Sequence, residues 1–191
     1  MSDRKARGDD RSPRPNPPEG PPLFAGANHI CIVTNDLDGA VRRWWDTYRV
    51  GPWRVFTYGH ANMDAAVDGQ PLEFKMRAAL AQLGPNFRIE IIQPMDEQGP
   101  YADSLRRNGN ADHLHHVRLD VPEFARTKDE LAALDLPVRL DATFRDSSGN
   151  ADPVRAMYFD TSGELGFLLE IGDAPPGFSM PDPDYVYPPT D

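Results

Sequence analysis

Two histidines and two glutamates occupy equivalent places in the two halves of this 191-residue chain. His29 is the first residue of HICIVTNDLDGA, and His116 is the first residue of the similar segment HVRLDVPEFA. Glu90 is the next-to-last residue of RAALAQLGPNFRIEI, and Glu170 is the next-to-last residue of RAMYFDTSGELGFLLEI. Imidazole and carboxylate ligands of this kind suit a divalent ion such as Zn, Co, Ni, Mn or Fe(II), with positions left for water or substrate. We therefore predict one metal site made of all four residues.

A cation held in this way has a defined chemical use. It acts as a Lewis acid and stabilises the enolate that forms when a proton leaves the carbon α to a carbonyl. A base must lie within reach of that proton, and Glu90 or Glu170 could serve after detaching from the ion. We favour Glu90 as the catalytic base, because Arg88 and Gln93 on the same segment are polar.

Each half of the chain is predicted to supply the strands that carry these ligands. The order in both halves is a β-branched strand, an amphipathic helix and then about three strands. Strand side chains alternate between faces, so each half offers one His and one Glu on the face opposite its apolar, helix-covered side. An internal repeat of this length predicts an α+β fold of two modules in tandem, each with the order strand, helix and about three strands.

Further residues are predicted to lie near the ligands. Arg88 and Arg118 fall by parity on the ligand face, where a guanidinium can neutralise a substrate carboxylate, although a salt bridge at the rim explains them equally well. Cys31 is predicted to be a small residue lining the cavity. His115 is expected on the opposite face or at the rim. The polar stretch 59–70 is a candidate lid.

The domain boundaries follow from composition. Residues 1–22 and 174–191 hold many prolines and little large apolar surface, so both are predicted to be Pro-rich tails, and the second could lie extended against the body. Residues 23–173 form the predicted domain, with module one at about 27–97 and module two at about 112–172.

The bulk composition limits the partners. A formal net charge of −10 argues against nucleic acid, because neutralising phosphates requires a basic face. The single cysteine excludes an intrachain disulfide framework, and no apolar run approaches the ~20 residues of a membrane span. We expect a cytoplasmic protein that binds a small molecule and has neither a membrane nor a nucleic acid as a partner.

Four segments together resemble the vicinal oxygen chelate superfamily: NHICIVTNDLDGAVRRWW, FRIEIIQP, LHHVRLDV and YFDTSGELGFLLEI. This superfamily includes glyoxalase I, methylmalonyl-CoA epimerase, extradiol dioxygenases and bleomycin-resistance proteins, and the resemblance covers about residues 27–172. It implies an α+β fold of two βαβββ modules in tandem, whose curled mixed sheets form a cup around a metal, with ligands on the first and last strand of each module. Relatives are commonly dimers, so a homodimer is expected.

The resemblance narrows the reaction without fixing the substrate. Its closest look is to methylmalonyl-CoA epimerase and glyoxalase-like proteins, which implies a metal-dependent epimerase, isomerase or lyase acting on a small chelating substrate, either carboxylated or an acyl thioester. The net negative charge of the chain favours a smaller carboxylated or hydroxylated substrate over a nucleotide thioester, because the nucleotide part would favour a basic rim. The alternatives are an Fe(II)-dependent extradiol dioxygenase, which the fourth ligand Glu90 disfavours, and a metal-free sequestering protein, which the complete ligand set disfavours.

Overall fold

The computed structural model describes residues 20–145, 154–175, 178 and 180–189. The strands are β1 (Gly26–Val33), β2 (Trp53–Tyr58), β3 (Met63–Val67), β4 (Gln70–Pro71), β5 (Met76–Gln82), β6 (Arg88–Pro94), β7 (His113–Asp120), β8 (Val138–Phe144), β9 (Val154–Phe159), β10 (Leu168–Asp173) and β11 (Tyr185–Tyr187). The helices are α1 (Leu37–Tyr48), α2 (Pro100–Arg107), α3 (Phe124–Ala132) and α4 (Ser162–Leu165).

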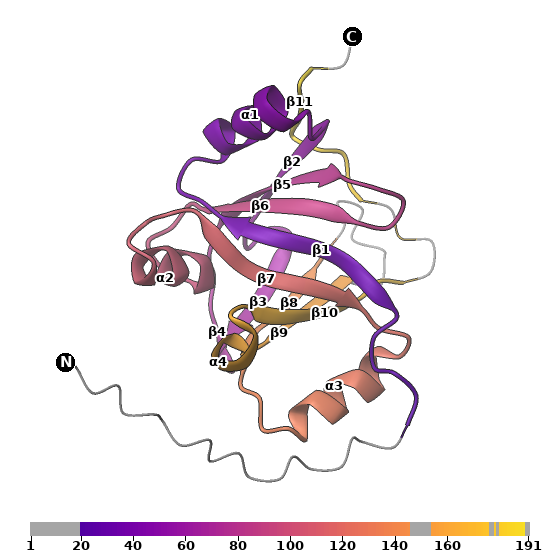
Figure 1. Ribbon diagram of the computed structural model, residues 1–191. Helices are drawn as coiled ribbons and strands as arrows, with labels where there is room; N and C mark the ends of the chain where they lie inside the picture. The colour runs from indigo at the N-terminus through magenta and orange to yellow at the C-terminus, as the bar shows by residue number, and fades with distance from the viewer. Residues whose placement is uncertain (1–19, 146–153, 176–177, 179, 190–191) are drawn as a thin grey trace, which may run out of the picture.

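The predicted α+β fold of two βαβββ modules is confirmed. Module one contributes β1, α1, β2, β5 and β6, and module two repeats the order with β7, α3, β8, β9 and β10. In both, the first strand runs parallel to the last, β1 beside β6 and β7 beside β10. The modules join where β1 pairs antiparallel with β7, so that the sheet runs β11-β2-β5-β6-β1-β7-β10-β9-β8-β3-β4. Figure 1 shows β1 and β7 crossing the middle of this curled sheet.

Each module buries one face of its sheet under its own helix. In module one, α1 covers an apolar cluster that includes Leu37, Val41 and Ile91, and in module two α3 covers one that includes Leu131 and Ile171. The two helices lie at opposite ends of the molecule in Figure 1. This explains the alternating pattern of the strands, because every second side chain must enter a helix-covered cluster.

The other face of the curled sheet forms the inside of the cup. Its apolar cluster draws on both modules, with Val33 and Met76 from module one and Leu140, Ala156 and Tyr158 from module two. The helix α2, which precedes β7, adds Tyr101 and Leu105 to the same cluster. One interior is therefore shared by both modules, and the four predicted ligands open into it.

The start of α1 shows how the local sequence sets an element boundary. Asp36 is the N-cap, and its carboxylate accepts a hydrogen bond of 2.9 Å from the backbone N–H of Gly39. The helix ends at Arg49, which adopts the left-handed conformation with φ of 58°. β1 ends at Val33 and α1 begins at Leu37, so the loop between them is short and fixes the helix over the outer face of module one.

Two segments have more structure than the sequence pattern predicted. The stretch 59–70 is not a free lid, because β3 pairs antiparallel with β8 of module two along five residue pairs. The segment predicted to be a C-terminal tail contains β11, which pairs with β2. Of the predicted N-terminal tail, residues 1–22, positions 1–19 lie outside the described residues.

Among the residues that the structure describes, none of the helices is both long and apolar enough to span a membrane.

Candidate metal centre

The four predicted ligands converge on one point inside the cup. His29 lies on β1 and Glu90 on the parallel strand β6, while His116 lies on β7 and Glu170 on the parallel strand β10. The register makes the halves equivalent, because Glu90 pairs with the second residue after His29, and Glu170 pairs with the second residue after His116. Two strand pairs of the same geometry therefore deliver one imidazole and one carboxylate each to the seam between the modules.

The ligand atoms lie close enough to hold a single cation. The two Nε2 atoms of His29 and His116 are 3.3 Å apart. Glu170 Oε2 lies 3.1 Å from each of them, and Glu90 Oε2 lies 3.4 Å from His29 Nε2 and 3.3 Å from His116 Nε2. His116 is fully buried, and His29 and Glu170 are nearly so.

These spacings fit a divalent ion. Ligands bound at about 2.0–2.2 Å to one ion lie roughly 3.0–3.5 Å apart when they occupy adjacent coordination positions. The cluster also holds two carboxylates in a buried place, which is costly without a compensating positive charge. His29, Glu90 and His116 offer one ligand atom each within 4.8 Å of one another. Glu170 is not part of this group of three, but its Oε2 lies 3.1 Å from both Nε2 atoms.

The electrostatics of the protein without a cation show how strongly the site favours positive charge. Burial lowers the pKa of His116, but hydrogen bonds to Glu170 and Glu90 outweigh it and raise the pKa to about 9. Burial raises the pKa of Glu170, yet His29 and Arg118 hold that pKa well below its ordinary value. The carboxylates thus stay ionised, and in the absence of a metal a proton on imidazole supplies the positive charge.

The two carboxylates differ in their second partner. Glu170 Oε1 accepts a hydrogen bond of 3.2 Å from Arg118 Nη1, so both of its oxygens are engaged. Among the described residues, no arginine pairs with Glu90, whose side chain is 13% exposed against 4% for Glu170. Glu90 is therefore the freer of the two.

The predicted substrate residues fall in different places. Arg88 and Arg118 both line the cavity that three of the four candidate ligands, all but His116, also line. Arg88 donates a hydrogen bond to Asn28 Oδ1. Cys31 is fully buried in the inner cluster and is not among the lining residues, so the structure does not support the predicted contact with substrate. Burial, with the charge of Glu90 after it, raises the pKa of the Cys31 thiol well above its ordinary value.

The cavity beside the ligands is small and largely apolar. Its volume is about 110 Å³. The C-terminal segment supplies part of its wall through Phe178, Met180 and Pro181. Arg54 donates a hydrogen bond of 3.2 Å to the Pro181 carbonyl, which helps to hold this segment over the cavity.

The sequence pattern missed two tyrosines in this cavity. Tyr101 of α2 and Tyr158 of β9 are buried, and their hydroxyl oxygens are 2.9 Å apart. Burial raises the pKa of both phenols well above the ordinary value, so they stay neutral hydrogen-bonding groups. Tyr158 also packs against the ring of His116, with centroids 4.5 Å apart. The sequence held no spacing signal for Tyr101, because α2 lies between the two repeats, and the repeat places Leu80 rather than a tyrosine opposite Tyr158.

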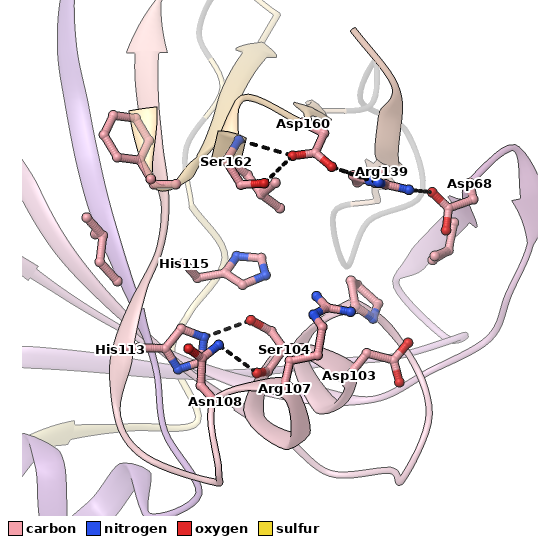
Figure 2. Close-up of a pocket in the computed structure, with 16 residues that line it drawn as sticks. Asp68, Asp103, Ser104, Arg107, Asn108, His113, His115, Arg139, Asp160 and Ser162 are labelled. Atoms are coloured by element: carbon pink, nitrogen blue, oxygen red, sulfur yellow. Dashed lines mark hydrogen bonds and ion pairs between the residues drawn. The ribbon is translucent and has the colours of Figure 1, made fainter. Parts of the chain in front are cut away.

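The prediction for His115 was wrong. Its side chain is 4% exposed rather than at the rim, and its Nδ1 lies 2.9 Å from Nδ1 of His116. Behind it is a second, larger pocket of about 580 Å³ that does not contain the metal ligands. Figure 2 shows the His115 ring in this pocket, with Ser162 on one side and Ser104 and Arg107 on the other.

Solved structures with the same fold include several methylmalonyl-CoA epimerases. One, from Mycobacterium tuberculosis, is 20% identical with a TM-score of 0.55, and the match covers 80% of this chain and 91% of that one. Another, from Streptomyces coelicolor and solved with 2-nitronate-propionyl-CoA, is 19% identical with a TM-score of 0.55, covering 78% of this chain and 96% of that one. A selenomethionine methylmalonyl-CoA epimerase is 15% identical with a TM-score of 0.54, covering 82% and 99%. At these identities the likeness shows the fold alone.

A search of curated proteins finds no match to this chain. A family model described as "Glyoxalase/Bleomycin resistance protein/Dioxygenase superfamily" matches residues 28–158, which is more than half of the sequence and includes three of the four metal-ligand candidates. The family model, the paired βαβββ modules and the solved structures agree, and the chain belongs to the glyoxalase/bleomycin resistance protein/dioxygenase superfamily.

Proposed function

We propose that this protein is a metal-dependent epimerase or isomerase, or a lyase, that removes a proton α to a carbonyl of a small chelating substrate. The observation that carries the proposal is the convergence of two His Nε2 atoms and two Glu Oε2 atoms at contacts of 3.1–3.4 Å. His29, Glu90, His116 and Glu170 would hold a divalent ion. When bound, that ion supplies Lewis acidity for the oxygens of the substrate.

Glu90 is the better candidate for the base. Glu170 is fixed by Arg118, whereas Glu90 has no arginine partner among the described residues and lines the cavity. Burial raises the pKa of Glu90, but His29 and His116 lower it overall, so the carboxylate is ionised near neutral pH, which is the form that a general base needs. Glu90 also lines the cavity in which the α-carbon of a bound substrate would lie.

The walls of the cavity support a small, carboxylated substrate. Three arginines line the cavity together with apolar side chains such as Met76, Phe144 and Phe178: Arg88, Arg118 and Arg145. Ligand pockets commonly have volumes of about 300–1,000 Å³, and the cavity here is about 110 Å³. This volume favours an acid of a few carbon atoms over a substrate with a long thioester arm inside the same cavity.

Isotope exchange tests this proposal directly. The metal-loaded protein, in D2O, would be incubated with methylmalonyl-CoA and separately with small 2-substituted carboxylic acids, and loss of the α-proton signal followed by NMR. We expect exchange with at least one compound, and Glu90→Gln should slow it by about 10²–10⁴-fold. Lys128→Gln, an exposed change far from the cup, is the control and should exchange at the wild-type rate. Unchanged exchange in Glu90→Gln would remove Glu90 from the role of base.

A further inference from the structure

The residue before each candidate ligand histidine contacts that histidine. Asn28 Oδ1 lies 3.1 Å from Nδ1 of His29, and His115 Nδ1 lies 2.9 Å from Nδ1 of His116. Neighbouring residues of a regular strand point to opposite faces, so such contacts are not expected between them. Their occurrence in both modules requires a common local cause.

That cause is a pair of β-bulges in the pairing of β1 with β7. The register shifts between Ala27 and His29 on β1, which leaves Asn28 as the extra residue. It shifts again where Cys31 pairs with His116 and the next residue of β1 pairs with Leu114, which leaves His115 as the extra residue. A bulge turns the inserted side chain away from its regular direction, and here each one brings that side chain beside the ligand.

The direction of the two hydrogen bonds follows from counting protons. A histidine that binds a metal through Nε2 keeps its proton on Nδ1, which must then donate. Asn28 can receive this bond, because its Oδ1 also accepts from Arg88 while its Nδ2 donates to Asp120 Oδ1 at 2.7 Å. His115 can receive the other through an unprotonated Nδ1, which leaves its own proton on Nε2, facing the pocket of Figure 2.

The opposite direction for the second bond conflicts with metal binding. If His115 donated from Nδ1, His116 would accept at Nδ1 and its Nε2 would carry the proton, pointing N–H at the place of the cation. The direction that is compatible with metal binding therefore runs from Nδ1–H of His116 to Nδ1 of His115.

We propose that Asn28 and His115 are positioning residues that hold the two ligand imidazoles with their Nε2 lone pairs directed at the cation. This inference rests on the proposed metal centre and adds to it the groups that orient its histidines. His115 has the larger role, because it is nearly fully buried, and its loss leaves the Nδ1–H of the fully buried His116 without its acceptor.

The test compares two changes of equal size at His115. His115→Leu removes the acceptor, whereas His115→Asn places an amide oxygen where Nδ1 was. Zn²⁺ affinity would be measured by competition with a chromophoric chelator, and Co²⁺ absorption spectra would report the ligand geometry. We expect His115→Leu to weaken Zn²⁺ binding by about 10–100-fold, and His115→Asn to remain within about threefold of the wild type. His113→Leu, in the same strand and pocket but without a contact to a ligand, should also keep the wild-type affinity.

Two results would overturn the proposal. One is a folded His115→Leu variant with wild-type affinity, and the other is an equal loss in His115→Leu and His115→Asn. NMR of the ¹⁵N-labelled, Zn²⁺-loaded wild type gives an answer that needs no variant. We expect the proton on Nδ1 of His116, with a coupling across the hydrogen bond to an unprotonated Nδ1 of His115, and the reverse assignment would exclude the role. Failure of the proposed reaction is a separate result, because a protein that binds Zn²⁺ without α-proton exchange still gives these affinities.

Discussion

At the level of single residues, the site depends on which side-chain atoms share a buried volume. Four residues of the right types were predicted from the sequence, because the repeat placed them at equivalent positions, and the structure brings their ligand atoms together. Their roles as metal ligands stay predictions that metal analysis must test. His115 was misplaced, because strict strand alternation puts it on the far face, and a bulge changes that parity without any mark in the sequence.

Metal binding should stabilise the folded protein measurably. An ion that binds the folded state alone adds about 2.7 kcal/mol to the free energy of unfolding at a free concentration of 100 times Kd. We expect the Tm from calorimetry to rise when Zn²⁺ or Co²⁺ is added to chelator-treated protein and to fall again with excess chelator. His116→Ala, which removes a fully buried ligand, should abolish this rise. An equal rise in both proteins would mean that the metal binds elsewhere.

At the level of elements, the C-terminal strand β11 is tied to the first helix by a network of three side chains. Arg77 Nη1 and Nη2 donate to the two carboxylate oxygens of Asp38 at 3.0 and 2.9 Å. The hydroxyl of Tyr185 donates to Asp38 and accepts from Arg77. This network holds the segment that carries Phe178 and Met180 at the cavity, which composition alone did not reveal, because a Pro-rich stretch has no helical or alternating period.

The network makes the anchoring of β11 sensitive to acid. Hydrogen bonds from Arg77 lower the pKa of Asp38 to about 2. Because this folded-state pKa lies below the ordinary value, the ionised carboxylate stabilises the folded state above about pH 4, and the contribution is lost as the pH falls from about 4 to about 2. Asp38 is partly exposed, so we expect a contribution under about 1 kcal/mol.

Urea unfolding at several pH values provides the measurement. The free energy of unfolding of the wild type should exceed that of Asp38→Asn at pH 6, and the difference should shrink as the pH approaches 2.5. A difference that stays constant over this range would show that the charge of Asp38 has no part in the anchoring. Limited proteolysis of the C-terminal segment should follow the same pH dependence.

At the level of the whole molecule, the two modules share one interior. Repeat and strand period were enough to predict two similar modules of a strand, a helix and about three strands, since these depend on hydrophobic pattern, while the cup was implied by the family resemblance. The pairing of β3 with β8 was not predicted, because it joins residues about 80 positions apart and the stretch 59–70 reads as a polar loop. Long-range pairing of a short strand near the edge of the sheet depends on the shape of the completed sheet rather than on its own sequence.

A cavity in the shared interior should therefore weaken the entire fold. Leu140 of module two is 1% exposed and packs in the cluster that also contains Val33 and Met76 of module one. We expect Leu140→Ala to lower the free energy of unfolding by about 2–5 kcal/mol, with a single transition seen by both fluorescence and circular dichroism. Leu134→Ala is the matched control, because Leu134 is 64% exposed, and it should cost at most about 0.5 kcal/mol. Two separate transitions in the Leu140→Ala protein would contradict a common interior.

Because β3 precedes α2 in the chain but pairs with β8 of module two, the chain cannot be divided between its modules without breaking strand pairings. A cut in the connection after α2 would leave β3 with the first fragment and its partner β8 with the second, while β1 and β7 would be parted in the same way. The pairing of β11 with β2 would also be broken, so each piece would carry half of the ligand set and three unsatisfied strand edges. The halves resemble each other in architecture, yet neither keeps all of its strand pairings or all four candidate ligands without the other.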